Sequence, residues 1–237
     1  MADKQYVSNQ VFVGYSWKRI RNMFERRIKY LHQHYPLHFK AMGREYEQSA
    51  TDLFEEIKRQ IGKSSAAIFD VTGGSPNVAL EFGYAEALEI DIALTLNERK
   101  PRKHVKLRGL ELPVAIISDL RGKRVNFYRS QPTLDMFLLR YTKQHPYARS
   151  FKTMCREHNI TDFGKKVLLY VIRLFDSREV IRRDELVQKI LSQFPALNRK
   201  VPQKKSRRYK WIDFTMEVMP QYKLISISRG RYSQVRI

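Results

Sequence analysis

Cysteine and long apolar runs are nearly absent from this chain. Cys155 is its one cysteine in 237 residues, which excludes an internal disulfide and a zinc site built on several cysteines. No apolar stretch approaches the roughly 18 residues of a membrane-spanning helix, and the first residues, MADKQYVSNQ, lack the apolar middle of a signal peptide. We therefore expect a cytoplasmic protein in a reducing compartment, with no membrane partner.

Two frequent nucleotide-binding patterns are missing as well. The phosphate-binding loop GxxxxGKS/T does not occur, and Thr72-Gly73-Gly74 does not match the dinucleotide fingerprint GxGxxG. ATP hydrolysis is therefore not predicted, and we expect no bound cofactor. His32, His34 and His38 straddle a predicted helix end without a matching carboxylate pair, so they predict a solvated surface and no metal site.

Acidic residues are scarce relative to basic ones. The 45 Lys and Arg residues against 24 Asp and Glu give a formal net charge of +21 and a pI near 10.1. Residues 151–237 are the more basic part, with 20 basic and 8 acidic side chains. Such an excess predicts attraction to polyanions such as DNA or another nucleic acid. Two alternatives are that these side chains are only solvated cations and that the basic C-terminal part contacts a partner protein.

The first 150 residues alternate between short apolar runs and amphipathic helical patterns. This alternation predicts an α/β domain with a parallel sheet and crossover helices, whose ligands bind at the carboxyl ends of the strands. A basic stretch, 99–108, separates two of the strands. The predicted strands span 11–13, 37–39, 66–69, 92–96, 114–118 and 124–128, and the predicted helices span 17–34, about 51–61, 77–88 and 133–141.

The most informative stretch joins one of these strands to a helix. The apolar run 66–69 stops at Asp70, and Thr72-Gly73-Gly74 gives the backbone freedom to reverse. Ser75 suits a helix N-cap, and Pro76 suits the first helical position, where its missing N–H costs nothing. A strand, a tight turn and a helix are therefore predicted in succession.

Helical spacing divides the side chains of that helix between two faces. Asn77, Glu81 and Tyr84 fall on one face, which we expect to look toward a ligand at the end of the strand. Ala79 and Gly83 fall on another face, where small residues would let the helix lie close to the sheet. The carboxylate of Glu81 is thereby predicted to be aimed at a ligand.

From about residue 151 the pattern changes to three helices followed by two strands. The helices are predicted at 163–175, 184–194 and around 211–214, and the strands at 223–228 and 232–237. This order resembles a winged helix, in which the third helix enters a nucleic-acid groove and the hairpin flanks it. We therefore predict two domains, 1–150 and 151–237. The candidate nucleic-acid contacts are Lys204, Lys205, Arg207, Arg208, Lys210, Arg229 and Arg231.

Residues in the first part of the chain also carry a family resemblance. The matching residues are Gly14, Tyr15 and Ser16; Asp52, Leu53, Phe54 and Ile57; and Asp70, Thr72, Pro76, Asn77, Val78, Glu81, Gly83, Ala85 and Ala87. On these residues the stretch of roughly 10–100 resembles the nucleoside 2-deoxyribosyltransferase-like proteins and the related TIR-like nucleotide-binding proteins of bacterial defence. Phe82 stands where the family usually has Leu.

The resemblance implies a flavodoxin-like sheet and cleavage of the N-glycosidic bond of a nucleoside or nucleotide such as NAD, which would be a substrate. It places the catalytic glutamate at Glu81 and a substrate-orienting aspartate at Asp70. In the resembling families a neighbouring subunit often completes the pocket, which predicts a homo-oligomer. The residues then expected to bind the nucleotide are Gly14, Tyr15, Ser16, Thr72, Gly73, Gly74, Asn77 and Tyr84.

The chemistry of these residue types agrees with that expectation. Breaking a ribose–base bond passes through an oxocarbenium-like state, which Glu81 can stabilise as a carboxylate or trap as a glycosyl-enzyme. Asp70 can hold ribose hydroxyls or raise the pKa of Glu81, since two nearby carboxylates raise one another's pKa. The N–H groups of Gly73 and Gly74 can receive a phosphate, and Tyr15 or Tyr84 can stack on a base.

Two other interpretations stay open at this stage. In the first, Glu81 only favours the N-terminal half of its helix, Asp70 only caps a turn, and the glycines serve only the reversal. In the second, the α/β domain binds a nucleotide without cleaving it, and the winged helix binds DNA as a regulator. Loss of base release in a Glu81 variant would separate the enzyme from both.

Overall fold

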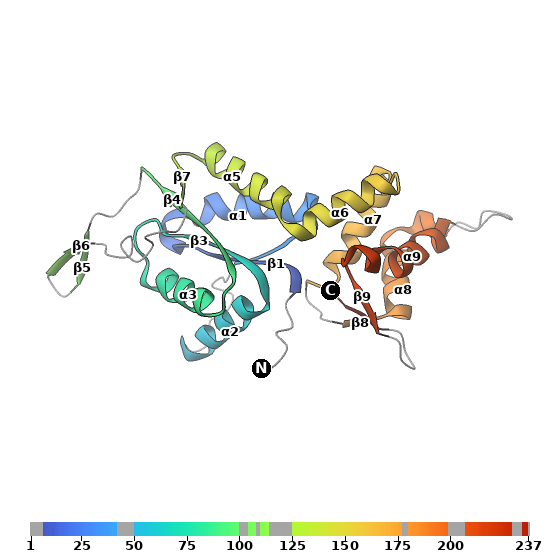
Figure 1. The fold of residues 1–237 in the computed structure, drawn as a ribbon, viewed down its shortest axis with the longest axis horizontal. Helices are drawn as coiled ribbons and strands as arrows, with labels where there is room; N and C mark the ends of the chain where they lie inside the picture. The colour runs from blue at the N-terminus through green and yellow to red at the C-terminus, as the bar shows by residue number, and fades with distance from the viewer. Residues whose placement is uncertain are drawn as a thin grey trace. The chain divides into compact units, whose positions relative to one another are not determined.

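The computed structural model describes residues 7–41, 50–99, 104–107, 110–113, 125–176, 180–198, 207–228 and 234–236 (Figure 1). The chain divides into two compact units. The first comprises Met1–Gln33 and Phe39–Thr142, and the second comprises His34–His38 and Lys143–Ile237. The unit boundary thus lies before the position at 150 that the sequence suggested. No helix among the described residues has the length and apolar character needed to span a membrane.

The first unit is built on a five-stranded parallel sheet with the order β2-β1-β3-β4-β7. Counting only these strands along the chain, the order is 2-1-3-4-5, which is consistent with a flavodoxin-like sheet. The predicted α/β class with a parallel sheet is therefore confirmed. The strands are β2 (His38–Ala41), β1 (Val7–Gly14), β3 (Ser64–Asp70), β4 (Asp91–Asn97) and β7 (Val125–Tyr128).

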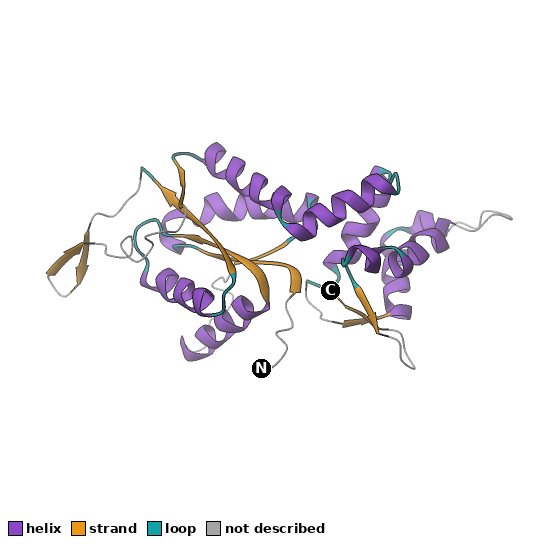
Figure 2. Cartoon of the chain, viewed as in Figure 1, coloured by secondary structure: helices purple, strands orange, loops and turns teal. Residues whose placement is uncertain are grey.

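Helices cover both faces of this sheet (Figures 1 and 2). Helices α1 (Trp17–His34) and α5 (Gln131–Gln144) lie on one face, where the Gln131 side-chain amide donates to the Met23 carbonyl at 2.9 Å. Helices α2 (Ala50–Lys63) and α3 (Pro76–Ala87) lie on the other face. The sequence predicted all four helices, α2 from its apolar spacing and α3 from Ser75 and Pro76 at its start.

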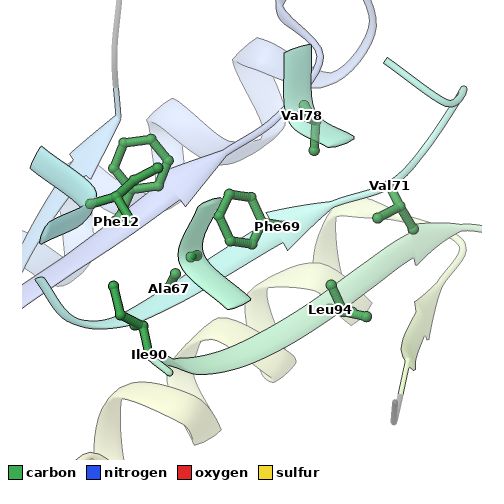
Figure 3. Packing of buried hydrophobic residues seen from close by; sticks show 9 residues of the cluster. Phe12, Ala67, Phe69, Val71, Val78, Ile90 and Leu94 are labelled. Atoms are coloured by element: carbon green, nitrogen blue, oxygen red, sulfur yellow. The ribbon is translucent and has the colours of Figure 1, made fainter. Parts of the chain in front are cut away.

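The core of the first unit explains why its central strands are apolar without alternation. Residues 11–13 of β1 and 66–69 of β3 are 2% exposed or less, because a parallel sheet covered on both faces buries every side chain. Figure 3 shows the part of the core under α3, where Phe12 and Phe69 lie with ring centroids 5.9 Å apart. The buried members of this cluster are Phe12, Ile61, Ala67, Phe69, Val71, Val78, Ala85, Ile90 and Leu94.

One insertion in the first unit was not predicted. Strands β5 (His104–Leu107) and β6 (Leu110–Pro113) form an antiparallel hairpin between β4 and β7. Charged residues in 99–108 separate the few apolar residues of the first hairpin strand. The sequence therefore predicted only a basic connection. The strand predicted at 114–118 lies outside the described residues.

The second unit contains the three predicted helices and the two predicted strands, together with a helix and a strand that were not predicted. Its strands form an antiparallel sheet with the order β8-β10-β9. The additional elements are α6 and β8. The helices are α6 (Pro146–Glu157), α7 (Asp162–Arg173), α8 (Arg183–Gln193) and α9 (Arg207–Glu217), with short 3-10 turns η1 (Pro195–Asn198) and η2 (Met219–Tyr222), and the strands are β8 (Val180–Arg182), β9 (Ser226–Ser228) and β10 (Gln234–Arg236).

Gly164 fixes the packing of α7 against the indole of Trp211 on α9. A Cβ at Gly164 would lie 2.1 Å from Trp211 Cη2 and 2.9 Å from Ile160 Cγ2. We expect Gly164→Ala to lower the free energy of unfolding by about 2 kcal/mol, because the overpacking outweighs the better helix propensity of alanine. Urea denaturation followed by tryptophan fluorescence measures the change.

Gly83 provides the matched control for that substitution. It is an exposed glycine in the interior of α3, and a Cβ there would meet nothing within 4 Å. Gly83→Ala should therefore stabilise the chain by about 0.5–1 kcal/mol. The expectation that Gly83 lets α3 approach the sheet was wrong, since Val78 and Ala85 are the residues of α3 that are buried. Equal effects of the two substitutions would contradict this account of α7.

Candidate functional site

The candidate site lies where β1 and β3 end at the carboxyl edge of the sheet. The two strands pair in parallel, with Gly14 of β1 opposite Phe69 of β3. From β1 the chain crosses to β2 on one side, and β3 continues the sheet on the other side. Such a reversal of strand order is the position at which open α/β sheets bind their ligands.

Glu81 reaches this point from the second turn of α3. A Cβ built on Gly14 would lie 2.6 Å from Glu81 Oε2, so the carboxylate lies directly against the backbone at the end of β1. The same Cβ would lie 2.6 Å from Phe69 Cδ1. A glycine is therefore required at position 14 for Glu81 and Phe69 to keep their places. The structure thus brings together two of the predicted site residues, Gly14 and Glu81.

The Glu81 carboxylate is partly buried, and burial raises its pKa to about 7. Across the described part of the chain no hydrogen bond or ion pair to this carboxylate is found that would offset its desolvation. At neutral pH the group is therefore divided between its neutral and its ionised form. A carboxyl group with a pKa so far from its usual value is typical of functional sites.

Asp70 has a different environment, because both of its carboxylate oxygens are used within the protein. The residue is completely buried; its Oδ1 accepts from the Thr72 N–H at 2.9 Å, and its Oδ2 accepts from the Thr95 hydroxyl at 2.8 Å. Burial raises the pKa of Asp70, and the hydrogen bonds from Thr72 and Thr95 oppose that rise. Asp70 therefore ties the turn after β3 to the neighbouring strand β4.

Two predictions need correction, one about the effect of Asp70 on Glu81 and one about Thr72. Burial alone raises the pKa of Glu81, so the expectation that Asp70 tunes Glu81 was wrong. Thr72, predicted to bind the nucleotide, is completely buried, and its hydroxyl oxygen accepts from the Asn97 N–H at 2.8 Å. In this structure the side chains of Asp70 and Thr72 hold the turn after β3 against β4.

Three residues of this network were missed in the sequence: Thr95, Asn97 and Tyr128. Tyr128 is buried next to Asp70, and its hydroxyl makes no hydrogen bond of ordinary geometry to any described residue. Burial and then the nearby Asp70 carboxylate raise the pKa of Tyr128. These residues lie on β4 and β7, far from Asp70 in the chain, so only the strand order brings them together.

The glycine turn has the predicted backbone conformation. Gly73 and Gly74 have φ values of 78° and 56°, in the left-handed region that favours glycine. The Gly74 N–H donates to the Val71 carbonyl at 3.2 Å, so it is already used within the turn. Ser75 is the N-cap residue of α3, without a side-chain capping bond, and Pro76 begins the helix.

The aromatic residues expected to stack on a base are occupied in the fold. The ring of Tyr15 stacks on Phe24 of α1, with centroids 5.1 Å apart and planes 13° from parallel. Tyr84 is partly buried and packs against the core cluster under α3. The other two predicted contacts remain nearer to solvent, since Ser16 is partly buried and Asn77 is exposed.

The remaining predicted residues lie in the second unit. His38 is not a solvated surface residue: its Nδ1 lies 3.2 Å from Asp176 Oδ1, and both side chains are largely buried. Arg207, Arg208 and Lys210 lie in the first turn of α9. The other candidate nucleic-acid contacts, Lys204, Lys205, Arg229 and Arg231, lie outside the described residues.

Comparison with known proteins gives no family assignment. No model of a known protein family matches the chain, and no curated protein sequence matches it significantly.

The environment of Glu81 predicts a pH-dependent cost to stability. Its pKa is about 7 in the folded chain against a usual value of 4.5, so the folded state holds this proton more tightly and loses stability as the pH rises from 4.5 to 7. Glu81→Gln removes that cost. It should stabilise the chain at pH 8 by about 2 kcal/mol, after allowing for the partial exposure of the carboxyl, and by almost nothing near pH 4.

Urea denaturation of both proteins at the two pH values measures this difference. Glu89→Gln, which removes an exposed carboxylate just after the same helix, is the matched control and should change stability little at either pH. A Glu81→Gln effect that is the same at pH 4 and pH 8 would contradict the burial of an ionisable carboxyl at this position.

Proposed function

We propose that the first unit cleaves the N-glycosidic bond of a nucleoside or nucleotide, with NAD among its candidate substrates, and that Glu81 is its catalytic carboxylate. One observation supports this most strongly. A partly buried carboxylate, without a hydrogen bond or ion pair from the described residues, lies against Gly14 where the strand order reverses.

The proposed reaction uses the ionised form of Glu81. As the C1′–N bond breaks, its electron pair leaves with the base and positive charge develops on the ribose. The carboxylate stabilises that charge or bonds to C1′ as a glycosyl-enzyme, after which water adds to C1′ and releases one proton. Because the group is partly removed from water, its electrostatic effect on the developing cation is larger than that of an exposed carboxylate.

In this proposal Asp70 acts through the turn that it supports. Its hydrogen bonds to Thr72 and Thr95 hold the end of β3 against β4, and α3 begins directly after that turn. The Asp70 network therefore sets the direction from which Glu81 approaches the ribose. A role in bacterial defence, a cytoplasmic location and completion of the site by a second copy of the chain are further proposals, which rest on the family resemblance.

We further propose that the second unit is a winged helix that binds nucleic acid. Its elements follow one another as α7, β8, α8, α9, β9 and β10, and its strands are ordered β8-β10-β9. This connectivity supports a helix-turn-helix core closed by a hairpin, in which α9 would be the recognition helix. The basic residues Arg207, Arg208 and Lys210 at the start of α9 support a polyanionic partner.

The second candidate function is a nucleotide sensor that binds its ligand without cleaving it and acts as a DNA-binding regulator. The connectivity of the second unit also favours this function. Incubating the purified chain with NAD and a panel of nucleosides and deoxynucleotides, with and without DNA, separates the two. Base release detected by chromatography supports the enzyme and identifies its substrate. A nucleotide that binds but releases no base under any condition supports the sensor.

A further inference from the structure

We infer that the solvent face of α6 binds the phosphate backbone of a nucleic acid. This helix precedes the three helices of the winged-helix order and has no part in the chemistry proposed for Glu81. The inference concerns a surface separate from the basic residues of α9. It rests on the proposal that the second unit binds nucleic acid, and the parallel α9 variant shows whether it fails while that proposal stands.

The position of α6 within the second unit is fixed by its apolar face. The Tyr147 hydroxyl donates to the Leu224 carbonyl at 2.7 Å, and the Tyr222 hydroxyl donates to the Glu157 carboxylate at the other end of the helix. Both bonds tie α6 to the segment that leads into β9. The residues of α6 that are buried are Tyr147, Ala148, Phe151, Met154 and Cys155.

The opposite face of α6 carries a row of cations. Arg149, Lys152 and Arg156 are exposed and follow one another at helical spacings of three and four residues, which places them on one side of the helix. Helical rise separates the first from the last by about 10 Å. Among the described residues none of the three has an ion-pair partner within 4 Å, and Glu157 is engaged by Tyr222.

A nucleic-acid backbone fits this row better than a membrane surface does. An amphipathic helix that binds a bilayer inserts its apolar face, whereas the apolar face of α6 is buried in the core of the unit. Three cations spread over about 10 Å can contact two or three successive phosphates, and arginine can bind each of them bidentately. The formal net charge of +21 steers a polyanion toward such a surface.

The test is the salt dependence of duplex DNA binding, measured by fluorescence anisotropy with a labelled duplex of about 30 base pairs. In the variant Arg149→Gln/Lys152→Gln/Arg156→Gln, the slope of log affinity against log salt should fall by about 2 to 3, since each lost phosphate contact removes about 0.9. The affinity at about 0.1 M salt should fall at least about tenfold. Unfolding curves establish that the variant is folded.

A matched control removes the same charges elsewhere. Arg26, Lys29 and Arg140 are exposed on α1 and α5 of the first unit, so Arg26→Gln/Lys29→Gln/Arg140→Gln has the same net charge as the α6 variant. It should keep a slope close to that of the unaltered chain. Equal losses in the two variants would mean that only net charge matters and would overturn the inference.

Three other results would also overturn it. These are unchanged DNA binding by the folded α6 variant, no DNA binding by the unaltered chain at low salt, and binding to vesicles of phosphatidylserine in preference to DNA. The variant Arg207→Gln/Arg208→Gln/Lys210→Gln is measured in parallel. If only this variant loses affinity, DNA binds through α9 and the role inferred for α6 is wrong.

Discussion

Replacing Glu81 by alanine is expected to lower the rate of base release at least about 1,000-fold without unfolding the chain. The structure places this carboxylate against the end of β1, where burial raises its pKa. Its removal takes away the stabilisation of positive charge on the ribose and leaves the Asp70 network intact. The measurement is base release under saturating substrate, with unfolding curves of both proteins.

The pH profile of the unaltered enzyme refines this prediction. Because the ionised carboxylate is the reactive form and its pKa is about 7, kcat should rise with pH through about 7 and then level off. Glu81→Gln keeps the shape of the side chain but cannot ionise, so it should be about as inactive as Glu81→Ala at every pH. A Glu81→Gln variant with substantial activity would contradict the role of the carboxylate.

Substituting Gly14 by alanine is expected to damage both stability and activity. The new Cβ would meet Glu81 Oε2 and Phe69 Cδ1 at 2.6 Å, and Phe69 is completely buried in the core under α3. The chain can relieve these contacts only by shifting the packed ring or by displacing the carboxylate. We expect a loss of about 2 kcal/mol in the free energy of unfolding, and base release about 100-fold slower.

The control for Gly14→Ala is again Gly83→Ala, which adds a methyl group to open space on α3. It should leave base release unchanged. Crystal structures of the Gly14→Ala variant would show whether Glu81 or Phe69 has moved. Full activity in a stable Gly14→Ala variant would show that Glu81 does not need its place against β1.

The sequence predicted most of the elements of the first unit because its central strands are continuous apolar runs, α2 has apolar residues at helical spacing, and α3 begins with Ser75 and Pro76. It also predicted Gly14, Asp70 and Glu81 at one edge of the sheet, since the carboxyl ends of parallel strands meet there. The partners of Asp70 could not be predicted. Thr95 and Tyr128 reach Asp70 only through the order of β3, β4 and β7 in the sheet.

Packing also determines which polar and aromatic side chains remain available to bind a ligand. Tyr15 follows β1 directly and looked suited to a base, but α1 brings Phe24 onto its ring. Thr72 looked suited to a ligand, but its hydroxyl accepts a bond from the β4 backbone. Such competition between a ligand and the fold depends on contacts that no local sequence pattern encodes.

In the second unit, α6 was missed because the boundary was expected at 150, inside this helix. Its start is marked by His145, whose ring nitrogen accepts from the Tyr147 N–H at 3.3 Å, and by Pro146 in the first turn. Pro146 suits the first helical position, because its missing N–H needs no partner there. Because the boundary was expected inside α6, the three cations of its solvent face were not recognised as one surface.

The proposed role of Glu81 is to break an N-glycosidic bond. Base release by the unaltered chain, Glu81→Gln and Glu89→Gln, measured side by side by chromatography on NAD and the nucleoside panel at pH 8, tests it most directly. We expect release by the unaltered chain and by Glu89→Gln, and none above background by the more stable Glu81→Gln variant. Equal release by all three proteins would contradict it.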